Sequence, residues 1–141
     1  RGYSVCLSGF YFSMRYTRYM KIKLKATNTT LTSAIREWVD LKLVGPVERL
    51  VGKKTDAVLL EIDFGKSTKH HKKGDIWFAE ANLTLGGAII RVESSASDAH
   101  AAIDNVAREL KEDIKKFTSK KTSKARAKER SLKGRIKRTL A

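Results

Sequence analysis

The sequence lacks the residues that covalent cross-links and several common catalytic sites require. Its 141 residues include one cysteine, Cys6, and one proline, Pro46. A single thiol excludes an intramolecular disulfide and a metal site built from several thiolates. The phosphate-binding motifs G-x-x-x-x-G-K-[ST] and G-x-G-x-x-G and the nucleophile motif G-x-S-x-G are also absent. We therefore expect no catalytic residue, no metal, no cofactor and no small-molecule substrate.

Long apolar runs are missing as well, and acidic residues are scarce at both ends. No apolar run approaches the roughly 18–20 residues that a membrane span needs, so no membrane partner is expected. Residues 118–141 hold ten Lys or Arg and the single acid Glu129, which gives them net +9 of the chain's +15. Residues 20–117 hold 17 basic and 14 acidic residues and net only +3. A segment of such dense like charge stays solvated or binds a polyanion.

The charge distribution predicts one domain, residues 20–117, between two appendages. Residues 1–19 lack acids and mix aromatics with Arg. Such a leader can be a transit peptide. Because Met20 begins a clean strand pattern, we favour in-frame upstream sequence, disordered or non-native. Residues 118–141 form a basic tail, disordered or helical on RNA; Lys and Arg at this density suit phosphates, whose condensed counterions are released on binding. A tail that only aids solubility is the alternative.

The first half of the domain begins with polar–apolar alternation. Residues 20–26 predict a half-buried strand with three lysines facing outward. Thr32 or Ser33 is a plausible N-cap for a helix whose apolar positions recur at helical spacing. Gly45-Pro46 should end or kink that helix, because Pro lacks the donor and clashes with the preceding turn. A short second helical piece then follows and closes at Gly52.

The second half of the domain predicts three further strands and an amphipathic helix. The strands cover residues 56–64, 75–85 and 88–95, with a tight hairpin turn at Gly86-Gly87. Ser97 or Asp98 caps the last helix. The element order is therefore β-α-β-β-β-α. The predicted fold class is α+β: a two-layer sandwich in which a four-stranded sheet carries both helices on one face, plus the basic C-terminal tail.

Several residues invite a site interpretation and are better explained otherwise. His70-His71 would suggest a metal, but the neighbouring lysines Lys69, Lys72 and Lys73 oppose one; an RNA-facing loop and a plain mobile loop remain open. His100 is interpreted as structural or as a surface residue, and both tryptophans are assigned to the core. The carboxylates Glu61, Asp63 and Glu80 are expected to pair across strands with Lys21, Lys23, Lys25 or Arg91.

Three stretches in order give the sequence a family resemblance. They are LTSAIREWV (residues 31–39) after the lysine-alternating strand, AEANL (79–83) and SDAHAAID (97–104). The sequence from Met20 resembles the ribosome hibernation promoting factor and ribosome-associated inhibitor family, also called the sigma-54 modulation family. The resemblance implies the fold given above and a non-enzymatic, cytoplasmic protein. Such a protein binds small-subunit rRNA near the tRNA and mRNA channel and silences idle ribosomes. With only 24 residues after Phe117, ten of them basic, the chain resembles a short form without a dedicated homodimerisation domain.

The resemblance also implies that cations of both helices meet rRNA. On the first helix these are Arg36, Lys42 and Arg49, and on the second Arg108, Lys111, Lys115 and Lys116. The break at Gly45-Pro46 departs from the family pattern and puts the register of Arg49 in doubt. The other cations that we predict to contact rRNA lie on the first strand, in the histidine loop, on the fourth strand and in the tail: Lys21, Lys23, Lys25, Lys69, Lys72, Lys73, Arg91, Lys120, Lys121, Lys124 and Arg126.

Two other functions fit the same composition. One is a double-stranded RNA-binding module, whose last helix usually starts with basic residues that grip phosphate. Here that start is acidic, with Asp98 and Asp104, which weakens this alternative. The other is a permanent ribosomal protein with a basic tail, which the sequence does not exclude.

Overall fold

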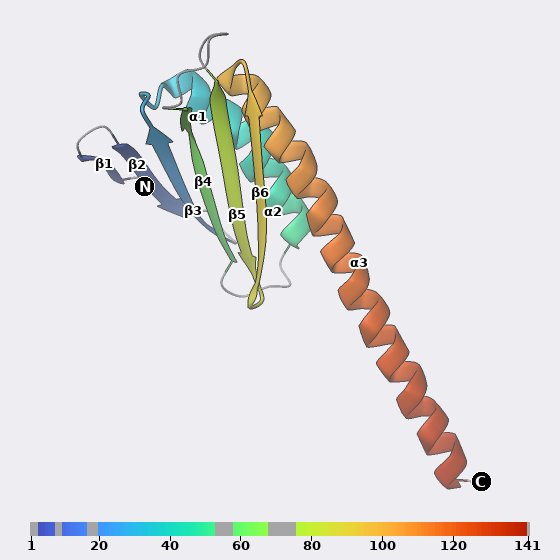
Figure 1. The fold of residues 1–141 in the computed structure, drawn as a ribbon. Helices are drawn as coiled ribbons and strands as arrows, with labels where there is room; N and C mark the ends of the chain where they lie inside the picture. The colour runs from blue at the N-terminus through green and yellow to red at the C-terminus, as the bar shows by residue number, and fades with distance from the viewer. Residues whose placement is uncertain (1–2, 8–9, 17–19, 53–57, 68–75, 141) are drawn as a thin grey trace.

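The computed structural model describes residues 3–7, 10–16, 20–52, 58–67 and 76–140 (Figure 1). All statements below concern these residues. The strands are β1 (Tyr3–Leu7), β2 (Phe10–Tyr16), β3 (Met20–Thr27), β4 (Val58–Lys66), β5 (Trp77–Leu85) and β6 (Ala88–Ala96). The helices are α1 (Ser33–Val39), the π-helical turn η1 (Asp40–Val44), α2 (Gly45–Val51) and α3 (Ala99–Leu140).

The strands form one mixed sheet in the order β1-β2-β3-β4-β5-β6. Strands β3 and β4 pair in parallel and all other neighbours pair antiparallel. The helical segment from α1 to α2 connects the parallel pair and lies with α3 on the same face of the sheet (Figure 1). The predicted β-α-β-β-β-α order and two-layer arrangement are confirmed by the elements from β3 to α3.

The core lies between the sheet and the helices. In β3, β4 and β5 every second residue is buried, as the alternation of apolar and polar residues predicts. Helix α3 contributes Ile103, Val106, Leu110 and Ile114, each at most 1% exposed. Trp38 and Trp77 are partly buried and pack against this core, as expected. The predicted hairpin at Gly86-Gly87 is also confirmed, with both φ angles positive, at 56° and 83°.

The first helix continues through Gly45-Pro46, where the sequence predicted an end or a kink. The helical path runs from Ser33 to Val51, and a π turn over Asp40–Val44 precedes Pro46. Pro46 stands in the first turn of α2, where its missing N–H costs least. The wider π turn relieves the clash that proline would cause in a regular α-helix. Gly52 closes α2 with a φ of 62°, as predicted.

Residues 3–16 differ from the expectation of a disordered leader. Strands β1 and β2 form a hairpin, and β2 pairs antiparallel with β3 from Phe10↔Thr27 to Tyr16↔Lys21. The backbone of β3 would otherwise present an unpaired edge, and pairing satisfies its donors and acceptors. Whether the segment is in-frame upstream sequence is a separate question and stays a prediction.

Helix α3 continues past Phe117, near which the sequence predicted its end, and runs through the basic tail to Leu140. The 23 residues beyond Phe117, the α3 extension (residues 118–140), project away from the sheet (Figure 1). Lys, Arg, Ala and Leu, all good helix formers, dominate this stretch, and proline is absent from it. Glu129 and Lys133 add an ion pair of 2.7 Å one turn apart. Residues 118–140 are therefore helical in the structure.

Candidate nucleic-acid interface

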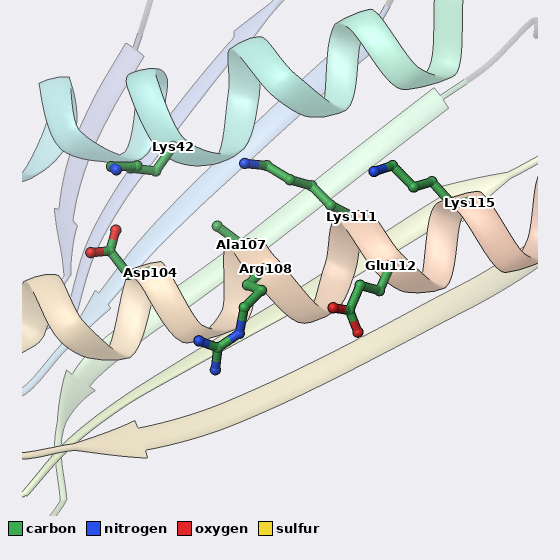
Figure 2. A pocket seen from close by; sticks show the side chains of 7 residues that line it. All are labelled: Lys42, Asp104, Ala107, Arg108, Lys111, Glu112 and Lys115. Carbon is green, nitrogen blue, oxygen red and sulfur yellow. The ribbon is translucent and has the colours of Figure 1, made fainter.

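A groove of about 400 Å³ runs between η1 and α3 on the helical side of the molecule (Figure 2). Lys42 reaches it from η1, and all the other lining residues come from α3. Four of the lining side chains are cationic and two are acidic: Lys42, Arg108, Lys111 and Lys115 against Asp104 and Glu112. The groove thus has a net positive lining on two elements that pack against the same core.

Buried neighbours on α3 set the positions of its cations. Leu110 and Ile114 are 0% and 1% exposed and fix the rotation of α3 on the sheet. Arg108, Lys111 and Lys115 recur at i, i+3 and i+7 beside this buried stripe and line the groove. In Figure 2 Lys111 and Lys115 point toward the helical segment that holds Lys42, and Arg108 points away from it. Their positions are therefore set by the core and not by a flexible loop.

Lys42 is held by an aromatic cluster at the end of the groove that Asp104 also lines. Its ammonium lies 5.0 Å from the centroid of the Trp38 ring, within cation–π range. The His100 ring meets Trp38 edge to face at 5.1 Å. With Lys42 and His100 against it, the Trp38 ring serves the packing of α1 on α3, in agreement with its assignment to the core.

The other predicted helix cations do not line the groove. The Arg49 side chain donates to the carbonyl of Gly45 at 3.4 Å, and Lys116 pairs with Asp113 at 3.7 Å. Arg36 lies on α1 and is absent from the groove lining. Four of the seven helix cations that the resemblance implied are thus brought together, and three are not.

The outer face of the sheet carries paired charges. Lys23 lies 3.3 Å from Glu61, Lys25 lies 3.7 Å from Asp63, and the Arg91 guanidinium lies 3.2 Å from Glu80. The expected cross-strand pairing is confirmed for these three cations, which makes them weaker candidates for phosphate contacts. Lys21 stands on the same strand, next to Leu59 of β4.

Among these paired carboxylates, Asp63 has a shifted pKa. Burial raises the pKa of this carboxyl above its ordinary value of 3.8. The Thr27 hydroxyl donates to it at 3.0 Å. This hydrogen bond and the charge of Lys25 lower its pKa, while the nearby Glu80 raises it. The net direction is upward because desolvation of the charged form is the largest contribution.

The remaining predicted cations lie on the α3 extension or outside the described residues. Lys120, Lys121, Lys124 and Arg126 are exposed on the extension. The histidine loop with Lys69, Lys72 and Lys73 lies outside the described residues. Among the residues that are described, no group of three His, Cys, Asp or Glu side chains could hold a metal ion.

The sequence did not assign the acidic members of the groove to a site, and it left the tail as disordered or helical on RNA. Asp104, Arg108 and Glu112 recur at four-residue spacing, which places them on one stripe of a helix and could have assigned all three to one surface. The extension could have been found from its lack of proline and its helix-forming composition.

The structure is thus a two-layer α+β domain with a cationic groove on its helical side and a basic helical extension. The chain belongs to the sigma 54 modulation protein / S30EA ribosomal protein family, whose sequence model matches residues 22–122. The resemblance seen in the sequence is thereby confirmed, and the family is one of ribosome-associated proteins.

A solved structure agrees with this assignment. The chain is similar to the N-terminal domain of Protein Y from Thermus thermophilus, at 26% identity over 71% of this chain and 96% of that chain, with a TM-score of 0.53. It is also similar to a ribosomal subunit interface protein from Coxiella burnetii, at 14% identity over 72% and 98% of the two chains, with a TM-score of 0.49. None of the curated proteins matches the chain. No helix among the described residues is long and apolar enough to span a bilayer.

Proposed function

We propose that this protein binds rRNA of the small ribosomal subunit near the tRNA and mRNA channel and silences idle ribosomes in the cytoplasm. The observation that carries the proposal is the groove, where four cations stand on two packed helical elements. Family membership makes the ribosome the polyanion to test first.

The groove suits a phosphate backbone physically. Lys and Arg side chains that neutralise phosphates release condensed counterions, which gives affinity without reading sequence. Because Arg108, Lys111 and Lys115 stand on a helix anchored by buried residues, they fix where the domain docks as well as how tightly. Asp104 and Glu112 exclude phosphate from part of the lining by like-charge repulsion.

In the proposed mechanism the protein inhibits translation by occupying the small subunit and does not chemically modify it. A domain bound in the tRNA and mRNA channel excludes the ligands of translation for as long as it stays bound. Inhibition should therefore need nearly stoichiometric protein and should reverse on dilution into high salt. Inhibition by catalytic amounts of protein, persisting after the protein is washed off, would show a different mechanism.

The site is tested by charge reversal with chemical footprinting on salt-washed small subunits. Arg108→Glu, Lys111→Glu and Lys115→Glu together should abolish the protected rRNA nucleotides while the domain stays folded by circular dichroism. The matched control is Lys124→Glu, Lys128→Glu and Arg135→Glu, the same charge change outside the groove. The control should bind more weakly and keep the groove footprint. A groove variant that protects the same nucleotides would contradict the proposal.

A permanent ribosomal protein is the second candidate, favoured by the long basic extension of α3. The two functions differ in timing. A hibernation factor should be found on ribosomes of stationary cells and be nearly absent from those of growing cells. A sucrose-gradient profile of both samples decides between them.

A further inference from the structure

Helix α3 contains the same pattern twice. Residues 108–115 read RELKEDIK and residues 130–137 read RSLKGRIK, which are identical at five of eight positions. The shared positions form one set of cations and one apolar pair: Arg108/Arg130, Lys111/Lys133, Lys115/Lys137, Leu110/Leu132 and Ile114/Ile136. The first copy supplies the three α3 cations of the groove. The second copy lies in the extension.

The two copies lie on the same side of one continuous helix. They are 22 residues apart in sequence, which is about six turns and about 33 Å along the axis. The cations at 130, 133 and 137 therefore project within roughly 40° of those at 108, 111 and 115. Lys124, Lys128 and Arg135 are also exposed, but their positions place them on the opposite side of the extension.

The apolar pair is buried in the first copy and exposed in the second. Leu110 and Ile114 are 0% and 1% exposed beneath the groove, whereas Leu132 and Ile136 are 48% and 58% exposed. The extension projects beyond the sheet (Figure 1). The second copy thus keeps three cations on one side of the helix. Lys133 pairs with Glu129 at 2.7 Å, which makes Arg130 and Lys137 the stronger candidates for phosphate contacts.

The extension also carries charge that a polyanion would relieve. Lys120, Lys124 and Lys128 follow one another at four-residue spacing, as do Arg126 and Arg130. Like charges at this spacing destabilise a helix. Residues 118–141 contain only Glu129 to offset them. Phosphates along one side of the extension would reduce this repulsion.

We propose that residues 130–137 form a second phosphate-binding element, which contacts RNA about 33 Å from the groove while α3 acts as a rigid spacer. The inference rests on the proposed function, because the groove is taken as the first RNA contact. When two binding elements are linked, binding of the first makes binding of the second effectively intramolecular. This gain requires that the spacer length fits the distance between the two RNA sites. The extension then places its cations at a fixed distance and direction from the groove, and does not act as a diffuse charged tail.

The test compares two pairs of substitutions that remove the same charges from opposite sides of the extension. Arg130→Gln with Lys137→Gln removes one Arg and one Lys from the groove side, and Lys124→Gln with Arg135→Gln removes the same from the other side. Affinity for salt-washed small ribosomal subunits is measured at several salt concentrations, with footprinting of the rRNA. The first pair should make the slope of log affinity against log salt concentration shallower by about two. It should also remove the protection of rRNA nucleotides distant from the groove footprint. The second pair should change the slope less and keep both sets of protections.

Insertions test the rigid spacer independently. Two alanines after Ser123 rotate the second copy by about 200° and advance it about 3 Å, whereas four alanines rotate it by about 40° and advance it about 6 Å. The two-residue insertion should erase the distant protections and the four-residue insertion should preserve them, with helix content checked by circular dichroism.

The outcomes separate this inference from the proposed function. If both substitution pairs have equal effects while the groove footprint remains, the extension is a diffuse charged tail and the inference is wrong, although the proposed function stands. Equal effects of the two insertions would show that α3 does not act as a rigid spacer, which also overturns the inference. If the unmodified protein protects no nucleotides of the small subunit, the proposed function is wrong and the inference falls with it.

Discussion

The two ends of α3 share a sequence pattern and differ in everything that surrounds it. Leu110 in the first half is 0% exposed against the sheet, and its counterpart Leu132 in the extension is 48% exposed. Both lie in the same helix. The comparison teaches that the pattern specifies a helix with one apolar and one cationic side, while burial depends on whether a sheet lies opposite.

This difference divides stability from binding. The first half of α3 closes the core with its apolar side and lines the groove with its cationic side, so we expect truncations on the apolar side to affect folding and charge changes on the cationic side to affect binding. The extension has only solvent-exposed side chains along most of its length, so we expect its substitutions to affect binding and not folding. The predictions below test that division, starting with the largest effect.

Truncating the two equivalent leucines should give very different changes in the free energy of unfolding. Leu110→Ala should cost about 2–5 kcal/mol, because it removes buried atoms and leaves a cavity. Leu132→Ala should stay within about 0.5 kcal/mol of the unmodified protein, as exposed substitutions do. Denaturant unfolding measures both. A comparable loss for Leu132→Ala would mean that the extension packs against something in solution.

Removing the extension should weaken binding without weakening the fold. A chain that ends after Phe117 keeps the whole core, so its melting temperature should be nearly unchanged. Its affinity for small subunits should fall, with a log–log salt slope shallower by several units, about one for each lost phosphate contact. The groove footprint should remain. A truncated protein with a displaced footprint would show that the extension, and not the groove, positions the domain.

The sequence predicts the domain well because its periodicities are long and regular. The alternation in β3 and the three- to four-residue recurrence in α3 each name the buried face, and the structure buries those faces. The π turn before Pro46 was not predictable, since it depends on how α1 and α2 pack. The sequence left the tail as disordered or helical on RNA because its charge was treated as evidence for disorder, although Lys and Arg are good helix formers.

The candidate site was only half predictable. The family resemblance implied seven helix cations, and the structure brings four of them to one groove, Lys42 from η1 and Arg108, Lys111 and Lys115 from α3. Arg49 and Lys116 were included on the basis of charge and resemblance, yet they bond to the Gly45 carbonyl and to Asp113. Which cations face a shared groove depends on the packing of η1 on α3, and no local pattern encodes it.

Deleting residues 1–19 tests the other appendage and should have a smaller effect than deleting the extension. Among the side chains whose burial the structure describes, the buried apolar ones lie between Met20 and Ile114, so we expect nearly unchanged thermal stability and unchanged ribosome binding. The deletion exposes the backbone edge of β3, which β2 pairs in the structure, so self-association is the readout to monitor. A large drop in melting temperature would make β1 and β2 an integral part of the domain.

The smallest effect concerns pH and belongs to the sheet, on the side opposite α3. Burial raises the pKa of Asp63 in the folded protein above its ordinary value of 3.8, so the folded state binds this proton more tightly than the unfolded chain. The stability from this proton is present below about pH 3.8, the unfolded pKa, and is lost as pH rises through the folded pKa.

The variant Asp63→Asn cannot ionise at this position, so its free energy of unfolding relative to that of the unmodified protein should increase from pH 3.5 to pH 7. Denaturant unfolding across that range measures the difference, which should be the same with and without the extension. If the unmodified protein instead gains stability over the variant as pH rises, the Lys25 and Thr27 contacts outweigh burial. If the difference in free energy of unfolding changes when the extension is removed, the extension is not independent of the folded domain.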